Sequence, residues 1–359
     1  MSQPANPRPT LAAVAARAGV SASTASLVFS GRGPVAEATR VRVLGAAAEL
    51  DYAGPDPTAR SLRRGSTGVI GVVTEDRLGE AFRDPINLAL LDGLGEELAD
   101  EGFGLLVLPW SGDGGVDLSA APMDAAILLG CSADLARSVE ALQRRRIPLV
   151  AIEAPALPGV VGIDLDNAAA TRRGAELLRD LGHVRVALVT LPLDLARSRG
   201  PLTPERESGA TAFTASERIR GARVVFPAAS GVSAAGSSVG EGYTAGLAVL
   251  DVPEAERPTA VIAQSDLLAA GVIRAAEELG LDVPAQVSVL GFDDIALAAM
   301  VHPSLTTVAL PKEQAGRAAV DLLLHLLDRP ERPGPLRRDL PTQLMVRGST
   351  GPAPEREKR

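Results

Sequence analysis

The sequence predicts a small all-α head at the N-terminus, followed by an α/β core with two parallel, doubly wound sheets. Apolar residues recur at helical spacing from Thr10 to Leu50. Two closely spaced prolines in the run Gly54 to Pro57 then end this pattern, because proline cannot continue a helix. From Val69 onward, short apolar runs alternate with longer amphipathic ones, as is typical of parallel strands covered by helices. The 359 residues are enough for two or three domains.

The head is expected to contain three short helices, the first two arranged as a helix-turn-helix. In the run TLAAVAARAGVSASTASLVFSG, Ala15 leaves room for a crossing helix and Gly19 permits a positive backbone angle in the turn. Ser21 is placed to cap the second helix. The residues expected to form the shared core are Val14, Val20, Ala25 and Val28. An ordinary helical hairpin has the same pattern, but the N-terminal position and the following linker favour DNA binding.

The charge is distributed unevenly along the chain. Residues 1–65 carry eight arginines against four acidic residues, a balance of +4. Since the whole chain has a net charge of −8, the rest carries −12. A basic head on an acidic body indicates that the head, and not the whole protein, meets a polyanion.

The composition is that of a globular protein, with 46% hydrophobic, 22% charged and 3% aromatic residues. The single cysteine, Cys131, cannot form an intrachain disulfide, and three histidines without a cysteine cluster predict no zinc site. There is no apolar run of about 18 residues and no secretory leader pattern. We therefore expect a cytoplasmic protein without a metal or another cofactor.

The core is expected to hold at least eight strands, which suit two smaller sheets better than one. The expected strands are Val69 to Val73, Leu105 to Leu108, Ala125 to Leu129, Leu149 to Ile152, Val160 to Ile163, Val186 to Val189, Ala260 to Ala263 and Val287 to Leu290. A helix is expected from Pro85 to Ala99, a long loop from Pro192 to Gly209, and a polar, mobile tail after Val346.

With these motifs the chain resembles the LacI/GalR family of transcriptional regulators. The head motif is similar to the family's TLxDVAxxAGVSxxTVSxVLNG. Further matching runs are ARSLRRG at 59–65, GVIGVV at 68–73, LGH at 181–183, GFDDIALA at 291–298 and PSLTTV at 303–308. The resemblance implies a DNA-binding head at 1–54, a hinge helix at 55–66 and an effector-binding core of the periplasmic-binding-protein type at 67–350. Its lobes would be about 67–165 with 295–338, and about 166–294 with 339–350, before a mobile tail at 351–359.

The resemblance also implies DNA contacts in the head and hinge. They are Thr10, Leu11, Ser21, Ala22, Ser23, Thr24, Ser26, Leu27 and Ser30 in the head, and Ala59, Arg60 and Leu62 in the hinge. Many relatives carry an arginine where this chain has Leu27, so a strong guanine contact is absent here. Leu27 either touches a thymine methyl group or extends the core of the head. Leu62 matches a leucine that relatives insert into the minor groove, whereas without the resemblance the arginine-rich hinge is equally well a solvated linker.

Six residues of the core are implied effector contacts, and most of them follow strand ends, where open sheets place ligands. They are Phe82, Glu153, Arg218, Ser265, Asp266 and Asp293. Each polar or charged one alone is more often a helix cap or a surface charge, and a lone aromatic side chain such as Phe82 is usually part of the packing. The chain has Asp84-Pro85-Ile86-Asn87 where the family often has Asn-Pro followed by two aromatic residues, so a stacking platform is missing unless Phe82 or Trp110 replaces it.

The sequence thus predicts a homodimeric repressor that binds double-stranded operator DNA and responds to a small polar metabolite, expected by analogy to be a sugar. The residues are compatible with either release or promotion of DNA binding by that effector. The alternative is a solute-binding protein with the same core. An enzyme is disfavoured because no phosphate-binding glycine motif, nucleophile elbow or metal-ligand cluster occurs in a suitable context, and we expect no catalytic residue. Tetramer-forming members of the family carry a C-terminal leucine heptad, whereas the run GPAPEREKR cannot form a heptad seam. The resemblance therefore implies a dimer.

Overall fold

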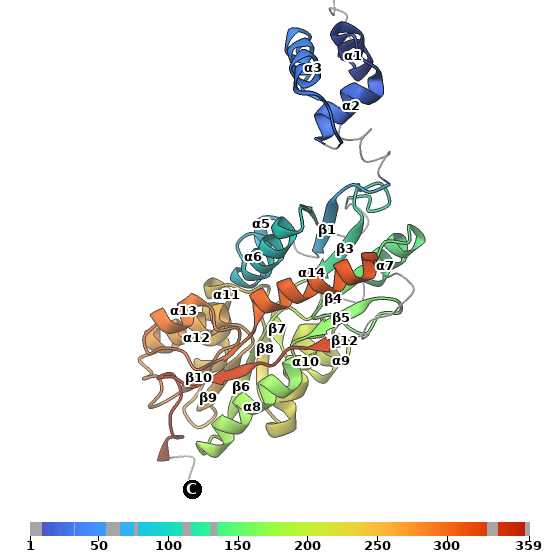
Figure 1. The fold of residues 1–359 in the computed structure, drawn as a ribbon. Coiled ribbons are helices and arrows are strands. Elements are labelled where there is room, and N and C mark those ends of the chain that lie inside the picture. The colour runs from blue at the N-terminus through green and yellow to red at the C-terminus, as the bar shows by residue number, and fades with distance from the viewer. Residues whose placement is uncertain are drawn as a thin grey trace, which may run out of the picture. The chain divides into compact units, whose positions relative to one another are not determined.

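The computed structural model describes residues 9–31, 33–54, 65–74, 78–109, 116–129, 135–328 and 337–355. The chain forms two compact units, the head within Met1–Gly68 and the core within Val69–Arg359 (Figure 1). The expected hinge contacts Ala59, Arg60 and Leu62, together with Trp110 and Cys131, lie outside the described residues.

The head contains the three expected helices, α1 (Leu11–Ala18), α2 (Ala22–Ser30) and α3 (Glu37–Glu49). The hydroxyl of Thr10 caps α1 by accepting a hydrogen bond from the N–H of Ala13, and Ser21 caps α2 by accepting one from Thr24. Gly19 ends α1 with φ +66°, the left-handed conformation that the tight turn requires. These local signals confirm the predicted helix-turn-helix.

Small side chains let the helices of the head pack closely around one apolar core. The buried residues are Val14, Ala15, Ala18, Ala25, Val28, Val43, Ala46 and Ala47. No single described helix of the protein is long and apolar enough to cross a membrane. Helices α1 and α2 match a span only when they are joined, and the chain bends by 106° between them.

The first lobe of the core is a six-stranded sheet in which all neighbouring strands are parallel. In spatial order it holds β12 (Arg337–Asp339), β5 (Val161–Asp164), β4 (Leu149–Ile152), β3 (Ala125–Leu129), β1 (Val69–Thr74) and β2 (Gly104–Pro109). Strands β1, β3 and β4 are almost entirely buried because helices cover both faces. Helices α6 (Pro85–Asp100) and α14 (Lys312–Asp328) pack on one face, and α7 (Leu135–Arg144) covers the other; the short α5 (Leu78–Ala81) precedes α6.

Helices α6 and α14 cross at a glycine pair. A Cβ atom on Gly93 would lie 2.2 Å from the carbonyl oxygen of Glu313, and one on Gly316 would lie 2.5 Å from that of Leu90. The crossing therefore requires glycine on both helices. The start of α6 lines the cavity between the two lobes that is described in the next section.

The second lobe is a five-stranded sheet that is parallel except at one edge. Its spatial order is β10 (Ser288–Leu290), β9 (Ala260–Ala263), β6 (Val186–Thr190), β8 (Ser230–Ser233) and the antiparallel β7 (Gly200–Pro201). Helices α11 (Val239–Leu250) and α12 (Asp266–Glu278) cover one face, while α8 (Asn167–Asp180) and α10 (Phe213–Val225) cover the other. Two sheets of the expected kind are thus confirmed.

The chain passes between the lobes after β5, around β11 (Thr307–Ala309) and again after β12. Strand β11 pairs with the antiparallel β13 (Gln343–Met345), and Leu344 of β13 packs against the apolar cores of both lobes. Helix α13 (Ala296–Met300) packs against α12 of the second lobe, although it follows the boundary expected at residue 295.

Two expected irregular segments have more structure than periodicity indicates. The segment from Pro192 to Gly209 is not one long loop, because it contains β7 and the short helix α9 (Pro204–Ser208), which Thr203 caps. Since α9 buries no side chain, no apolar stripe marks it in the sequence. The tail is ordered as far as it is described, to Glu355: Ala353 is buried and its N–H donates to the carbonyl of Leu181.

Candidate functional site

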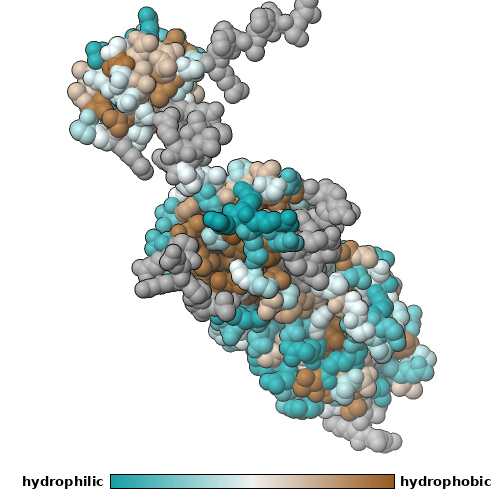
Figure 2. Space-filling view, turned by 90° about the vertical axis from the view of Figure 1, so that its right-hand side faces the viewer, coloured by the Kyte–Doolittle hydropathy of each residue, from teal (hydrophilic) through white to brown (hydrophobic). Residues whose placement is uncertain are grey.

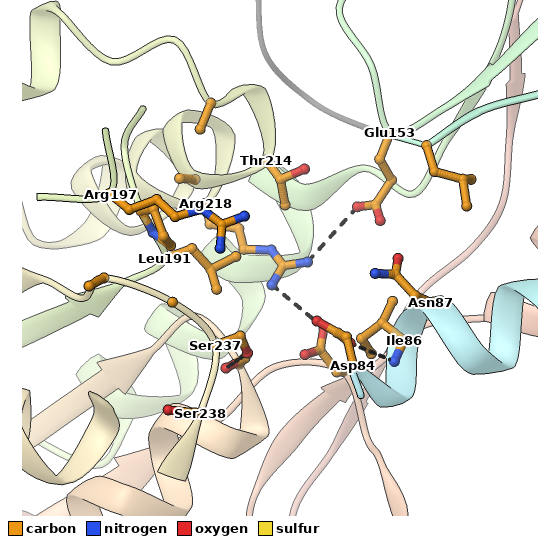
Figure 3. Close-up of a pocket in the computed structure, with 18 of the residues that line it drawn as sticks. Asp84, Ile86, Asn87, Glu153, Leu191, Arg197, Thr214, Arg218, Ser237 and Ser238 are labelled. Carbon is orange, nitrogen blue, oxygen red and sulfur yellow. Dashed lines mark hydrogen bonds and ion pairs between the residues drawn. The ribbon is translucent and has the colours of Figure 1, made fainter. Parts of the chain in front are cut away.

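A cavity of about 490 Å³ lies between the two lobes of the core (Figure 3). The first lobe contributes the start of α6 and the end of β4, and the second lobe contributes α10 and the loops after β6, β8 and β9. Four of the six expected effector contacts line this cavity, namely Glu153, Arg218, Ser265 and Asp293. The carboxyl ends of the strands thus meet there, as expected for an open parallel sheet.

Arg218 of α10 is the central charged side chain of the cavity, and it is almost fully buried. One of its terminal nitrogens lies 3.5 Å from Oδ1 of Asp293 and donates to the carbonyl of Gln264. The other lies 3.9 Å from Oε1 of Glu153, which belongs to the first lobe. The guanidinium also stacks over the ring of Phe292, 3.7 Å from its centroid. Arg218 therefore links charged groups of both lobes (Figure 3).

Two buried residues hold Arg218 in place, Asn167 through its amide oxygen and Gln264 through its main-chain carbonyl, and the sequence analysis missed both. Asn167 accepts a hydrogen bond from Nε of Arg218 at 2.7 Å and donates to Oε1 of Glu153 at 2.6 Å. The Gln264 amide accepts from the N–H of Leu191 and donates to the carbonyl of Ala215. Both amides directly follow a strand or begin the next helix, so the rule that pointed to Ser265 could also have found them.

The carboxylates beside Arg218 lie on unusual backbone. Glu153 has φ +55° and Asp293 has φ +114°, backbone conformations that residues other than glycine rarely adopt. The N–H of Asp293 donates to the carbonyl of Val308, which fixes this backbone against β11. Burial raises the pKa of Asp293 well above its usual range, while the charge of Arg218 opposes the rise. The site thus combines a strained backbone with a desolvated carboxyl group beside the cavity.

Asp266 and Phe82 do not line the cavity, contrary to the expectation. Asp266 is fully buried at the start of α12, where it accepts hydrogen bonds from the N–H of Ile295 and the hydroxyl of Thr307. It therefore joins the second lobe to β11 instead of facing a ligand. Phe82 is 49% exposed and is absent from the cavity wall. No aromatic side chain lines the cavity within the described residues.

The segment that lacks the expected aromatic platform supplies polar groups instead. Asp84 caps α6 by accepting from the N–H of Ile86 at 2.8 Å, and both Asp84 and Asn87 line the cavity. On the second lobe, Ser237 donates a hydrogen bond to Ser265 at 2.9 Å. Carboxylates, amides, hydroxyls and a guanidinium therefore surround one space, an arrangement suited to a ligand with several hydroxyl groups.

The head has a separate candidate site on the outer side of α2. Ser21, Ala22, Ser23, Leu27 and Ser30 are exposed. Thr24 and Ser26 are half-buried, as is Leu11 on α1, while Thr10 is exposed at the start of that helix. Leu27 is 41% exposed and does not belong to the buried core of the head.

Comparisons with known proteins cover both units. A family model described as bacterial regulatory proteins, lacI family, matches residues 10–54, and a periplasmic binding protein-like domain matches residues 175–350. The HTH-type transcriptional regulator Rv3575c of Mycobacterium tuberculosis is 34% identical, over 99% of this chain and 100% of the relative. The lac repressor dimer bound to operator and the anti-inducer ONPF is 26% identical, with a TM-score of 0.76 over 96% of this chain and 99% of the other. The CelR–cellobiose complex is 27% identical, with a TM-score of 0.66 over 95% and 100%.

Proposed function

The chain belongs to the lacI family of bacterial regulatory proteins, and from this premise we propose that it is a homodimeric repressor. Its head binds double-stranded operator DNA in the bacterial cytoplasm. A small sugar or related polyhydroxylated metabolite, bound in the cavity of the core, changes the affinity for that DNA.

The observation that carries this proposal is the meeting of both lobes at Arg218. Its guanidinium faces Glu153 of the first lobe and Asp293 beside the crossover strand β11. Charged groups make strong hydrogen bonds to ligand hydroxyls, particularly where water is excluded. The similar CelR structure holds cellobiose and the similar lac repressor structure holds operator and ONPF, which supports a sugar-like effector and a DNA partner.

The proposed mechanism is a shift between two arrangements of the lobes. A ligand that bonds to Glu153 of one lobe and to Arg218 of the other stabilises the arrangement in which both contacts are made. The chain crosses between the lobes at several places. A change in the arrangement of the lobes therefore shifts the segments that connect them. The resulting shift in the spacing of the two heads of a dimer sets the affinity for operator DNA.

Helix α2 is the proposed recognition helix, because the second helix of a helix-turn-helix enters the major groove. Ala22, Ser23 and Leu27 then face bases, and Ser21, Thr24 and Ser26 approach phosphates. Thr10, Leu11 and Ser30 complete the proposed contacts of the head. From the family resemblance alone, Leu62 is proposed as a minor-groove contact, Arg60 as a phosphate contact and Ala59 as a further DNA contact.

The alternative of a transport solute-binding protein is less favoured, since the Rv3575c relative matches the head as well as the core. Binding without catalysis is proposed for the cavity. In its described lining the side chains able to act as bases, Asp84, Glu153, Asp194 and Asp293, occur without a histidine or cysteine. Arg218 forms ion pairs with Glu153 and Asp293, an arrangement suited to holding a ligand.

The test uses the full-length protein in two steps. Selection from random double-stranded DNA should enrich one two-fold symmetric sequence, because a dimer presents two heads. A thermal-shift panel of monosaccharides, disaccharides and polyols should then give a hit that changes the affinity for the selected DNA. The absence of any enriched sequence would contradict the assignment as a DNA-binding regulator, and a hit that leaves DNA affinity unchanged would favour the solute-binding alternative.

A further inference from the structure

Helix α2 presents an uncharged face with a leucine near its centre. Leu27 lies with Ser23, four residues before it, and Ser30, three residues after it, on the side opposite the buried Ala25. The nine residues of α2, ASTASLVFS, contain no charged and no amide side chain. In Figure 2 the visible face of the head is mostly pale or brown, with little of the hydrophilic teal that covers much of the core.

This composition removes the side chains that usually distinguish bases in the major groove. Arginine or lysine binds guanine, asparagine or glutamine binds adenine, and acidic side chains accept from cytosine. Serine hydroxyls can donate to or accept from any base, so they discriminate weakly. The hydroxyl of Ser30 also donates to the carbonyl of Leu27 at 3.1 Å and is partly committed to the helix itself.

Leu27 is the one large apolar side chain that this face offers to DNA. It is 41% exposed, while Ala25 and Val28 supply the apolar contacts of α2 to the core. A Cβ atom on Gly33 would lie 3.6 Å from Cδ2 of Leu27, so glycine at this position leaves the space beside the leucine side chain open. In the major groove the C5-methyl group of thymine is the apolar partner available for such a side chain.

We propose that Leu27 is a specificity-determining residue that recognises the C5-methyl group of one thymine in each operator half-site. The inference rests on the proposed function, since it needs α2 in the major groove. Leu27 would distinguish thymine from the other bases, because the contact buries the thymine methyl group against the leucine side chain. Arginine at this position would instead form hydrogen bonds to guanine. Removing one buried methyl group weakens binding about four-fold.

The experiment replaces thymine by deoxyuridine, which deletes only this methyl group. The probe is the symmetric sequence that the full-length wild-type protein selects from random DNA, with deoxyuridine introduced at one thymine pair of symmetry-related positions at a time. Binding is measured for wild type, Leu27→Ala and Val41→Ala. Val41 is a matched control because it is 61% exposed on α3, outside the recognition helix.

For one pair of positions, we expect the double replacement to weaken wild type and Val41→Ala by roughly 15-fold, four-fold for each half-site. Leu27→Ala should bind thymine and deoxyuridine probes equally there. The proposal would be overturned if no thymine pair in the selected sequence gave this loss of wild-type affinity. It would also be overturned if deoxyuridine weakened the binding of Leu27→Ala by the same factor. Failure to select any sequence would instead overturn the proposed function, so the two failures are distinguishable.

Discussion

The guanidinium of Arg218 lies 3.5 Å from the carboxylate of Asp293, and both side chains are almost fully buried. Their partners come from different parts of the chain, with Glu153 on the first lobe and Asn167 at the start of α8. Removal of one charge from such a group leaves its partner buried without compensation. This relationship makes the cavity sensitive to single substitutions both in stability and in binding.

Replacing Arg218 alone should destabilise the protein more than replacing the pair. We expect Arg218→Met to lower the free energy of unfolding by about 3–5 kcal/mol at pH 7, because the carboxylates beside it lose their counter-charge. Adding Asp293→Asn should restore part of this loss. Urea unfolding of the three proteins measures both effects, and a double variant no more stable than Arg218→Met would show that the pair is not coupled.

Asp293→Asn alone should lower the affinity for the effector, and it should leave DNA binding in the absence of the effector unchanged. A charge-assisted hydrogen bond in a desolvated cavity contributes about 1–3 kcal/mol, so the affinity for the sugar found in the thermal-shift panel should fall by that amount. Calorimetry measures the affinity, with Asp282→Asn at a turn outside the cavity lining as the control. Wild-type affinity in Asp293→Asn would remove this carboxylate from the site.

Asp266 should make stability depend on pH in the mildly acidic range. Burial, the largest cause, raises the pKa of Asp266 to about 6. The folded protein therefore favours the protonated acid, and this contribution to stability is full below pH 4 and is lost as pH rises to about 6. Relative to Asp266→Asn, wild type should lose roughly 3 kcal/mol of unfolding free energy between pH 4 and pH 7. Equal pH profiles in urea unfolding would show that the carboxylate is not protonated in the fold.

The core should fold without the head, provided that the C-terminal segment is retained. The Ser349 hydroxyl accepts from the N–H of Thr306 and donates to the carbonyl of Val289, and the ring of His183 bonds to the carbonyl of Gly351. Residues 69–355 should therefore unfold cooperatively, whereas residues 69–348 should be less stable by roughly 2–4 kcal/mol. Equal urea midpoints would contradict a structural role of this segment. The isolated core should show no affinity for the selected operator.

Leu27→Arg should change the operator preference toward guanine at one position in each half-site. Arginine would supply the bidentate donor pair that α2 lacks, and exposure of the side chain lets the substitution be made without disturbing the core of the head. Selection from random DNA with this variant gives the new consensus. An unchanged consensus would place residue 27 away from the bases.

Local sequence was sufficient for the head and for the central strands of the core. Thr10, Ser21 and Gly19 act through their own backbone or that of the next few residues, so their roles follow from chain order. The strands 125–129 and 149–152 are apolar throughout because helices cover both faces, and such runs can be recognised without knowing the neighbours. The edge strands Gly200–Pro201 and Arg337–Asp339 lack this signal and were missed, since each depends on one neighbouring strand.

The sequence by itself determined the helix-turn-helix, the alternation of strands and helices, and the polar residues at strand ends, because these depend on contacts within a few residues. Only the tertiary structure decided which of those polar residues share one cavity. Asp266 and Ser265 are adjacent in the chain, yet the first is buried against Thr307 and Ile295 while the second lines the cavity beside Ser237. The physical reason is that each side chain takes its partner from a segment distant in sequence, and the packing of the two sheets brings those segments together.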